Sequence, residues 1–125
     1  MSFFERYFAL LDGPDPFSSL DLVADDLRFS IHWSADGRSR EFTGGREELR
    51  GFIEAGEDWR DWRHHIFWSA REGDTEFAFG ETRFDDGRRI GTFMVVAQLD
   101  ADGRMTRYMA ARTPITEFSA VGVGE

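Results

Sequence analysis

The chain has no cysteine and no lysine, and only three of its 125 residues are proline. Without cysteine it has no disulfide and no thiolate nucleophile, which fits a reducing compartment. No stretch approaches the about 18 consecutive apolar residues of a membrane-spanning helix, and the N-terminus lacks the pattern of a signal peptide. We therefore expect a cytoplasmic protein with no membrane partner. The use of arginine for every basic residue suggests a GC-rich, bacterial genome.

The formal net charge of -9 argues against nucleic acid as a partner, because proteins that bind phosphate backbones usually carry a basic patch. The chain also holds thirteen phenylalanines and four tryptophans, which is a large aromatic load for its length. A small domain has difficulty burying so many rings in its core alone. We therefore expect one domain over residues 1–125, with a flexible tail at 119–125 and with an aromatic-lined cavity or an oligomer interface.

The C-terminal half predicts a meander of antiparallel strands. Its apolar stretches are rich in Phe, Val, Ile, Thr and Trp, as half-buried strands are. Short breaks between them contain Gly and Asp, which accept the positive φ angles that tight hairpins need. The predicted strands cover residues 64–72, 74–84, 89–99 and 105–112.

The N-terminal half predicts helices and one strand. Apolar residues at helical spacing begin directly after Ser2, which forms a capping-box pattern with Glu5. Helices are predicted over residues 2–11, 16–23 and 46–57, and a strand with one buried face over 27–33. This order predicts an α+β fold, a cone-shaped curved antiparallel sheet with the N-terminal helices packed on its concave face.

Five short stretches stand at the borders of these predicted elements. They are residues 25–29 (DDLRF), 42–49 (FTGGREEL), 63–66 (RHHI), 73–77 (GDTEF) and 100–104 (DADGR). In this order, over about residues 2–118, the chain resembles the nuclear transport factor 2-like superfamily and, within it, the SnoaL-like (polyketide-cyclase-like) group. That superfamily holds isomerases, dehydratases, epoxide hydrolases, cyclases and binding modules, so the resemblance does not fix a reaction.

The resemblance implies a conical cavity for a small apolar ligand and often a homodimer through the outer face of the sheet. In enzymes of this kind a histidine at the start of the first meander strand often points into the cavity, and His64 is the matching residue. The ketosteroid-isomerase branch keeps a carboxylate near the end of the first strand, where this chain reads Ser30-Ile31-His32-Trp33. The Asp-Arg-Asp set of the epoxide-hydrolase branch has no convincing match either, so neither activity is implied.

His64 is the first candidate for acid–base catalysis. Strand alternation places it on the same side as Ile66 and Trp68, which is the more apolar side and is expected to face the cavity. An imidazole there can transfer protons near neutral pH. The alternative is a histidine at a strand start that bonds only to backbone or water. His65 has the opposite orientation and is expected to face outward or into an interface.

Glu81 and His32 are the other catalytic candidates. Glu81 shares a strand side with Phe77 and Phe79, and if those rings are buried its carboxylate needs a partner or takes up a proton. Pairing with His64 would make an acid–base site, whereas pairing with an arginine would be structural. His32 lies on the polar side of its strand and would reach the cavity only if a bulge turned it inward.

Five side chains are predicted to contact a ligand: Trp33, Trp68, Phe79, Tyr108 and Arg112. Large aromatic residues line apolar pockets, although most of them simply belong to a core. The Tyr108 hydroxyl could donate to a ligand carbonyl or oxyanion. Arg112 shares a side of its strand with Tyr108 and, together with Glu81, could anchor an anion.

We expect no metal and no cofactor. His64 and His65 are adjacent on a strand and point to opposite faces, so they do not easily share one ion. Three functions stay open. The first is a cofactor-free lyase or isomerase that acts on a small carbonyl compound through His64 and Glu81. The second is a non-catalytic pocket for a hydrophobic metabolite, and the third is a dimerisation module whose cone is filled by Phe and Trp side chains.

Overall fold

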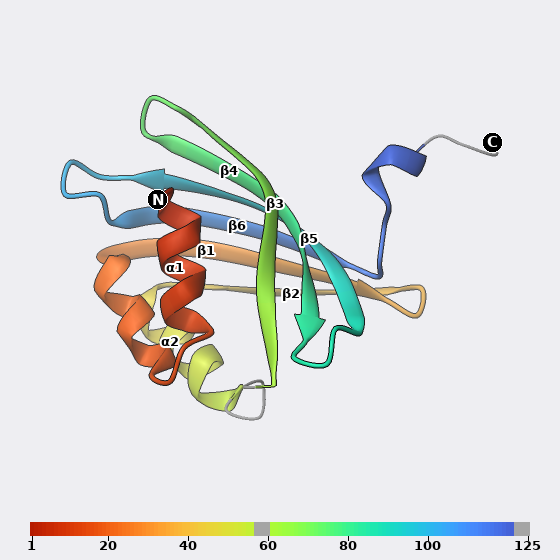
Figure 1. Cartoon of the computed structure of the whole chain (residues 1–125). Helices are drawn as coiled ribbons and strands as arrows, with labels where there is room; N and C mark the ends of the chain where they lie inside the picture. The colour runs from red at the N-terminus through yellow and green to blue at the C-terminus, as the bar shows by residue number, and fades with distance from the viewer. Residues whose placement is uncertain (57–60, 122–125) are drawn as a thin grey trace.

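The computed structural model describes residues 1–56 and 61–121. Six strands form one strongly bent sheet with the order β2-β1-β6-β5-β4-β3 (Figure 1). The strands are β1 (Val23–Ala35), β2 (Arg38–Gly44), β3 (Trp62–Glu72), β4 (Thr75–Phe84), β5 (Arg89–Leu99) and β6 (Met105–Thr113). The α+β fold with a curved, open sheet is therefore confirmed.

The helical segments lie mostly at one end of this sheet, and α1 crosses its concave face (Figure 1). They are α1 (Phe3–Leu11), the 3-10 helix η1 (Pro16–Leu22), α2 (Arg46–Ala55) and the 3-10 helix η3 (Phe118–Ala120). None of the helices in the described part of the chain is long and apolar enough to cross a membrane. The last residues of the tail predicted at 119–125, from 122 on, lie outside the described residues.

The sheet differs from the prediction in two respects. Residues 38–44 form the strand β2, which pairs with β1 as a hairpin, whereas no strand was predicted there. In addition, β1 pairs with β6 in parallel, so the sheet is mixed and not purely antiparallel. The four predicted strands of the meander are present and pair in antiparallel fashion from β3 to β6.

A β-bulge at Phe67 helps to bend the sheet. Ile66 pairs with Gly80 and Trp68 pairs with Phe79, so Phe67 is an extra residue on β3. A Cβ atom at Gly80 would collide with the backbone carbonyl of His65, which means that only glycine lets β3 and β4 approach this closely. Bulges of this kind increase the local twist and reverse the facing of the residues that follow.

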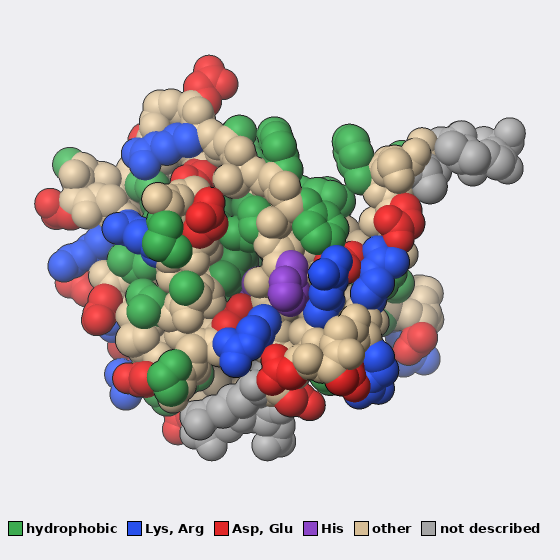
Figure 2. All heavy atoms as spheres, in the orientation of Figure 1, with side chains coloured by type: hydrophobic (Ala, Val, Ile, Leu, Met, Phe, Trp, Pro, Cys, Tyr) green, Lys and Arg blue, Asp and Glu red, His purple; other side chains and the backbone are tan. Residues whose placement is uncertain are grey.

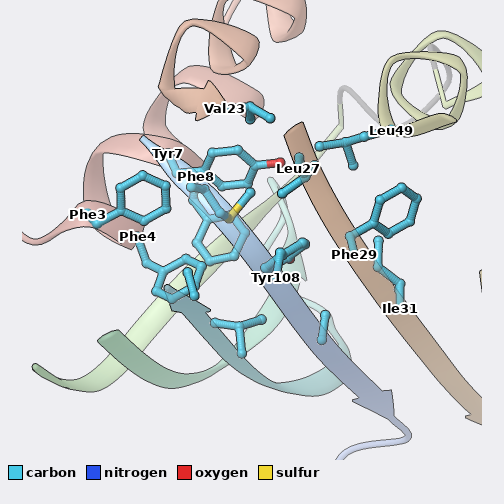
Figure 3. Packing of buried hydrophobic residues seen from close by; sticks show 14 of the residues in the cluster. Phe3, Phe4, Tyr7, Phe8, Val23, Leu27, Phe29, Ile31, Leu49 and Tyr108 are labelled. Atoms are coloured by element: carbon cyan, nitrogen blue, oxygen red, sulfur yellow. The ribbon is translucent and has the colours of Figure 1, made fainter. Parts of the chain in front are cut away.

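The narrow part of the cone is filled by aromatic rings from α1. Phe3, Phe4, Tyr7 and Phe8 are each at most 3% exposed and project from the helix toward the sheet (Figure 3). The ring of Phe4 lies 6.1 Å from that of Tyr108 on β6. Rings at such separations pack favourably in edge-on or offset arrangements. The predicted helix face is therefore the main apolar contact between helix and sheet.

Glu76 joins the N-terminus of α1 to the sheet. Its side chain is buried on the inner face of β4, where its two oxygens accept hydrogen bonds from the backbone N–H groups of Phe3 (3.1 Å) and Phe4 (2.8 Å). Ser2 accepts a third bond from the N–H of Glu5, which confirms the predicted cap. Free N–H groups and the positive end of the helix dipole make this terminus a favourable place for a carboxylate.

We predict that Glu76→Gln lowers the free energy of unfolding by about 2 kcal/mol, because a buried charge-assisted pair of hydrogen bonds is reduced to a single neutral bond. Urea unfolding followed by tryptophan fluorescence measures the change. Glu72→Gln, at an exposed position on β3, removes the same charge and should change stability by less than about 0.5 kcal/mol. Equal effects of the two substitutions would contradict the role of Glu76.

Candidate functional site

The open end of the cone contains a hollow of about 660 Å3. The ends of β1, β4 and β6 and the beginnings of β3 and β5 surround it, and α1 covers the opposite end of the sheet (Figure 1). Most of the wall is apolar. The side chains that matter for its chemistry are Trp33, Trp62, Thr82, Phe84, Ile90 and Arg112. An apolar wall that carries few polar groups is typical of sites for small molecules.

Behind this wall, three side chains form a hydrogen-bonded row. Asp12, at the C-terminal cap of α1, accepts a bond from His64 Nδ1 (2.9 Å to Oδ1) and another from the backbone N–H of His64 (2.7 Å to Oδ2). Nε2 of the same imidazole accepts a bond from Arg112 Nη2 (2.9 Å). The carboxylate accepts a hydrogen bond from Nδ1–H and the guanidinium donates one to Nε2, so both bonds are made by the neutral Nδ1–H tautomer.

His64 is fully enclosed. Its side chain is 1% exposed, and its ring stacks on that of Phe8 with 3.9 Å between centroids. Burial is the main reason that the pKa of His64 falls to about 4, and the charge of Arg112 lowers it further, against the raising effect of Asp12. The imidazole is therefore neutral near pH 7 and both of its nitrogens are occupied. It supports Arg112 and does not itself line the hollow.

Arg112 is the one basic residue among the described side chains that line the hollow. Its guanidinium lies over the ring of Phe93, 6.0 Å from the centroid, and also hydrogen-bonds to Tyr108. Within residues 1–56 and 61–121, no carboxylate forms an ion pair with it. Its hydrogen-bond partners are thus neutral groups, and its positive charge is not cancelled by a direct neighbour.

Glu81 lies on the opposite face of the sheet from His64. It faces His65 across the β3–β4 ladder, whereas His64 faces Thr82, so the predicted pairing of Glu81 with His64 is wrong. Its buried carboxylate forms ion pairs with Arg83 (2.5 Å) and Arg89 (2.8 Å). Hydrogen bonds from these two arginines, of which that from Arg89 has the larger effect, hold the pKa of Glu81 below its usual range. Glu81 therefore pairs with arginine, which is the second of the two possibilities that its sequence position left open.

Neither His32 nor Trp68 reaches the hollow: His32 lies on the polar side of its strand, as its alternation indicated, whereas Trp68 is not on the predicted inner side. The pairing of β1 with β6 is regular from Arg28 to Trp33, so no bulge turns His32 inward; it is exposed and bonds to the hydroxyl of Ser30 at 2.7 Å. Trp68 follows the bulge at Phe67, which moves it to the outer face, where it is 59% exposed. Trp68 borders a second, more open hollow of similar volume between α1 and β3, which Asp12 and His64 also line.

The remaining predicted ligand contacts divide between three environments. Trp33 and Arg112 line the hollow, as expected. Tyr108 is buried beneath α1, where burial raises the pKa of its hydroxyl, and it is not part of the wall. Phe79 lies on the outer face, where its ring contacts those of Phe67 and Phe118. These three rings, from β3, β4 and η3, pack together outside the cone.

Asp12 is not among the predicted site residues. It directly follows the predicted first helix, which ends at residue 11. A carboxylate at a helix C-terminus is electrostatically unfavourable, because the free carbonyl groups there carry partial negative charge. An acid at that position therefore signals a compensating partner elsewhere, and here the partners are the imidazole and backbone of His64.

We predict that the stability provided by a neutral His64 is lost as the pH falls from about 6.5 toward 4. Unfolded histidine binds a proton in this window whereas the buried imidazole does not, so acid favours the unfolded chain, by on the order of 3 kcal/mol at pH 4. The stability difference between wild type and His64→Gln, from urea unfolding, should shrink over this range. A His64 ring that titrates near pH 6.5 in NMR spectra would contradict this.

Sequence comparison finds no matching family model and no curated protein of similar sequence. Solved structures, in contrast, match over most of the chain. A candidate isomerase of the SnoaL-like family from Agrobacterium tumefaciens is 16% identical, with a TM-score of 0.68 over 88% of this chain and 93% of the other. A candidate polyketide cyclase from Sinorhizobium meliloti is 16% identical, with a TM-score of 0.61 over 86% and 92%.

An NTF2-like protein of unknown function from Exiguobacterium is 20% identical, with a TM-score of 0.61 over 93% of this chain and all of the other. Identities this low establish the shared architecture and not a shared reaction. The structural neighbours of this chain are thus SnoaL-like and nuclear transport factor 2-like proteins, and the chain has their fold.

Proposed function

We propose that the protein binds a small, mainly apolar molecule in the hollow at the open end of its cone. The observation that carries this proposal is the hollow itself, about 660 Å3 in volume, with aromatic and aliphatic walls and with Arg112 as the one arginine among the described residues that line it. Sites for small ligands and cofactors have volumes of roughly 300 to 1,000 Å3 and combine apolar walls with a few polar groups. The rings of α1 fill only the narrow part of the cone.

Turnover of a carbonyl compound is a second candidate function. Arg112 and the carboxylate of Asp61 line the same hollow. A guanidinium held in place before the reaction can stabilise the negative charge that develops on a carbonyl oxygen, and a nearby carboxylate can accept the proton. The structural neighbours described as a candidate isomerase and a candidate polyketide cyclase favour this chemistry. His64 would then act as a positioning residue on Arg112, without Glu81.

We predict that 2-acetylnaphthalene or citral, an aromatic and a terpenoid carbonyl compound, raises the melting temperature of the protein, and that the rise grows with the logarithm of the free ligand concentration above Kd. Trp33→Ala should weaken binding by about tenfold, since it removes apolar contact area from the wall. Affinities are measured by titration calorimetry at a temperature where each variant is folded.

Trp68→Ala is the matched control, because it removes the same side chain from the exposed outer face and should leave affinity for these probes unchanged. Equal losses of affinity in Trp33→Ala and Trp68→Ala would show that the probes bind outside the hollow. If neither compound binds the wild type, the proposal that the hollow binds neutral carbonyl compounds is refuted.

We also propose that two copies associate through the outer face of the sheet. Exposed apolar side chains on β3 to β6 form this face: Phe67, Trp68, Phe77, Met94 and Met109. Figure 2 shows hydrophobic side chains gathered over the upper part of β3 and β4, with His and Arg side chains below them. Exposed apolar surface of this kind usually marks an interaction site. Since each copy carries a formal charge of -9, apolar contact must offset repulsion, and salt should strengthen the pair.

We predict a dimer for the wild type in sedimentation velocity at moderate salt, and a monomer for Met94→Glu, which introduces a charge into the apolar face. Ser39→Glu adds the same charge on the exposed strand β2 and should remain dimeric. A monomeric wild type at all salt concentrations would refute the association.

A further inference from the structure

Arg112 is a part-buried cation whose charge has no direct counter-ion. It lies at the inner wall of the hollow, and within the described ranges 1–56 and 61–121 no Asp or Glu forms an ion pair with it. A buried or half-buried charge without a partner is costly, because water that would solvate it is partly excluded. The same exclusion makes the site a strong attractor for an anion that arrives with a ligand.

The neighbours of Arg112 orient the guanidinium without neutralising it. Nη2 donates to His64 Nε2 at 2.9 Å, and the neutral imidazole is held in turn by Asp12. The ring of Phe93 lies beneath the guanidinium at 6.0 Å. One edge of the guanidinium is therefore fixed, and pre-organised donors of this kind lose little conformational freedom when they bind an anion.

We propose that the hollow selects small apolar molecules that carry one carboxylate, and that Arg112 binds this carboxylate. The inference rests on the proposed ligand-binding function and specifies its ligand class. A guanidinium matches a carboxylate in planar, often two-bonded geometry. The apolar body of the ligand would lie against Trp33, Trp62 and Ile90, which line the same hollow.

The remaining charges limit the ligand to a single negative charge. Asp61 lies at the edge of the hollow and is exposed, and the chain carries a formal net charge of -9. A phosphate monoester, with a charge of about -2, would need more donors than one guanidinium supplies and would be repelled more strongly. A monocarboxylate makes the full contact with Arg112, and its repulsion by the net negative charge of the protein is half as large.

The test compares 2-naphthoate with 2-naphthamide, which has nearly the same shape but no charge. Titration calorimetry with the wild type should show that the carboxylate binds about tenfold or more tightly than the amide, which is the scale of one charged hydrogen-bonded pair. Arg112→Gln should bind both probes with similar affinity, close to that of the wild type for the amide. Arg107→Gln, an exposed arginine on the same strand, should keep the full preference.

Equal affinity of the wild type for the two probes would overturn the carboxylate preference and leave the ligand pocket standing. Failure of both probes to bind would overturn both proposals. A preference that survives in Arg112→Gln would overturn the role of Arg112 as the anchor. The wild-type comparison decides the ligand class without a substitution, and Arg112→Lys, which keeps the charge, should retain part of the preference if Arg112→Gln fails to fold.

Discussion

The attachment of α1 to the sheet by a carboxylate at each end is the interaction on which the structure depends. Glu76 reaches from β4 to the N–H groups at the beginning of the helix, and Asp12 reaches from its end to His64 on β3. The first contact follows the helix dipole and the second opposes it. Between them the rings of the helix are pressed into the narrow part of the cone, so their position is set by polar contacts as well as by apolar packing.

The same attachment organises the candidate site. Asp12 fixes the tautomer of His64, and His64 in turn holds Arg112 at the wall of the hollow. A group that was expected to exchange protons with a ligand is instead part of the support for a cation. Burial explains the difference, because it removes both the charge of the imidazole near neutral pH and its access to the hollow. The packing of α1 on the sheet and the position of the Arg112 guanidinium therefore depend on the same contacts.

Much of the fold could be predicted from the sequence, because turn residues and alternating patterns act over short distances. The strand β2 escaped notice because every one of its residues from Arg38 to Thr43 is exposed, so it has no buried face to produce a pattern. Alternation also could not assign Glu81 to a face, since it shows which residues lie together but not which side is inside. The side of the sheet on which Trp68 lies depends on a bulge. A bulge arises from the pairing of two strands, so the alternation within one strand does not reveal it.

The extra residue in β3 affects both faces of the sheet. The insertion of Phe67 between two ladder pairs bends the sheet and also turns the following tryptophan outward. Without it Trp68 would project into the concave side, and the wall would be flatter. A change in this segment would therefore alter the curvature of the concave side and the apolar surface of the outer face together.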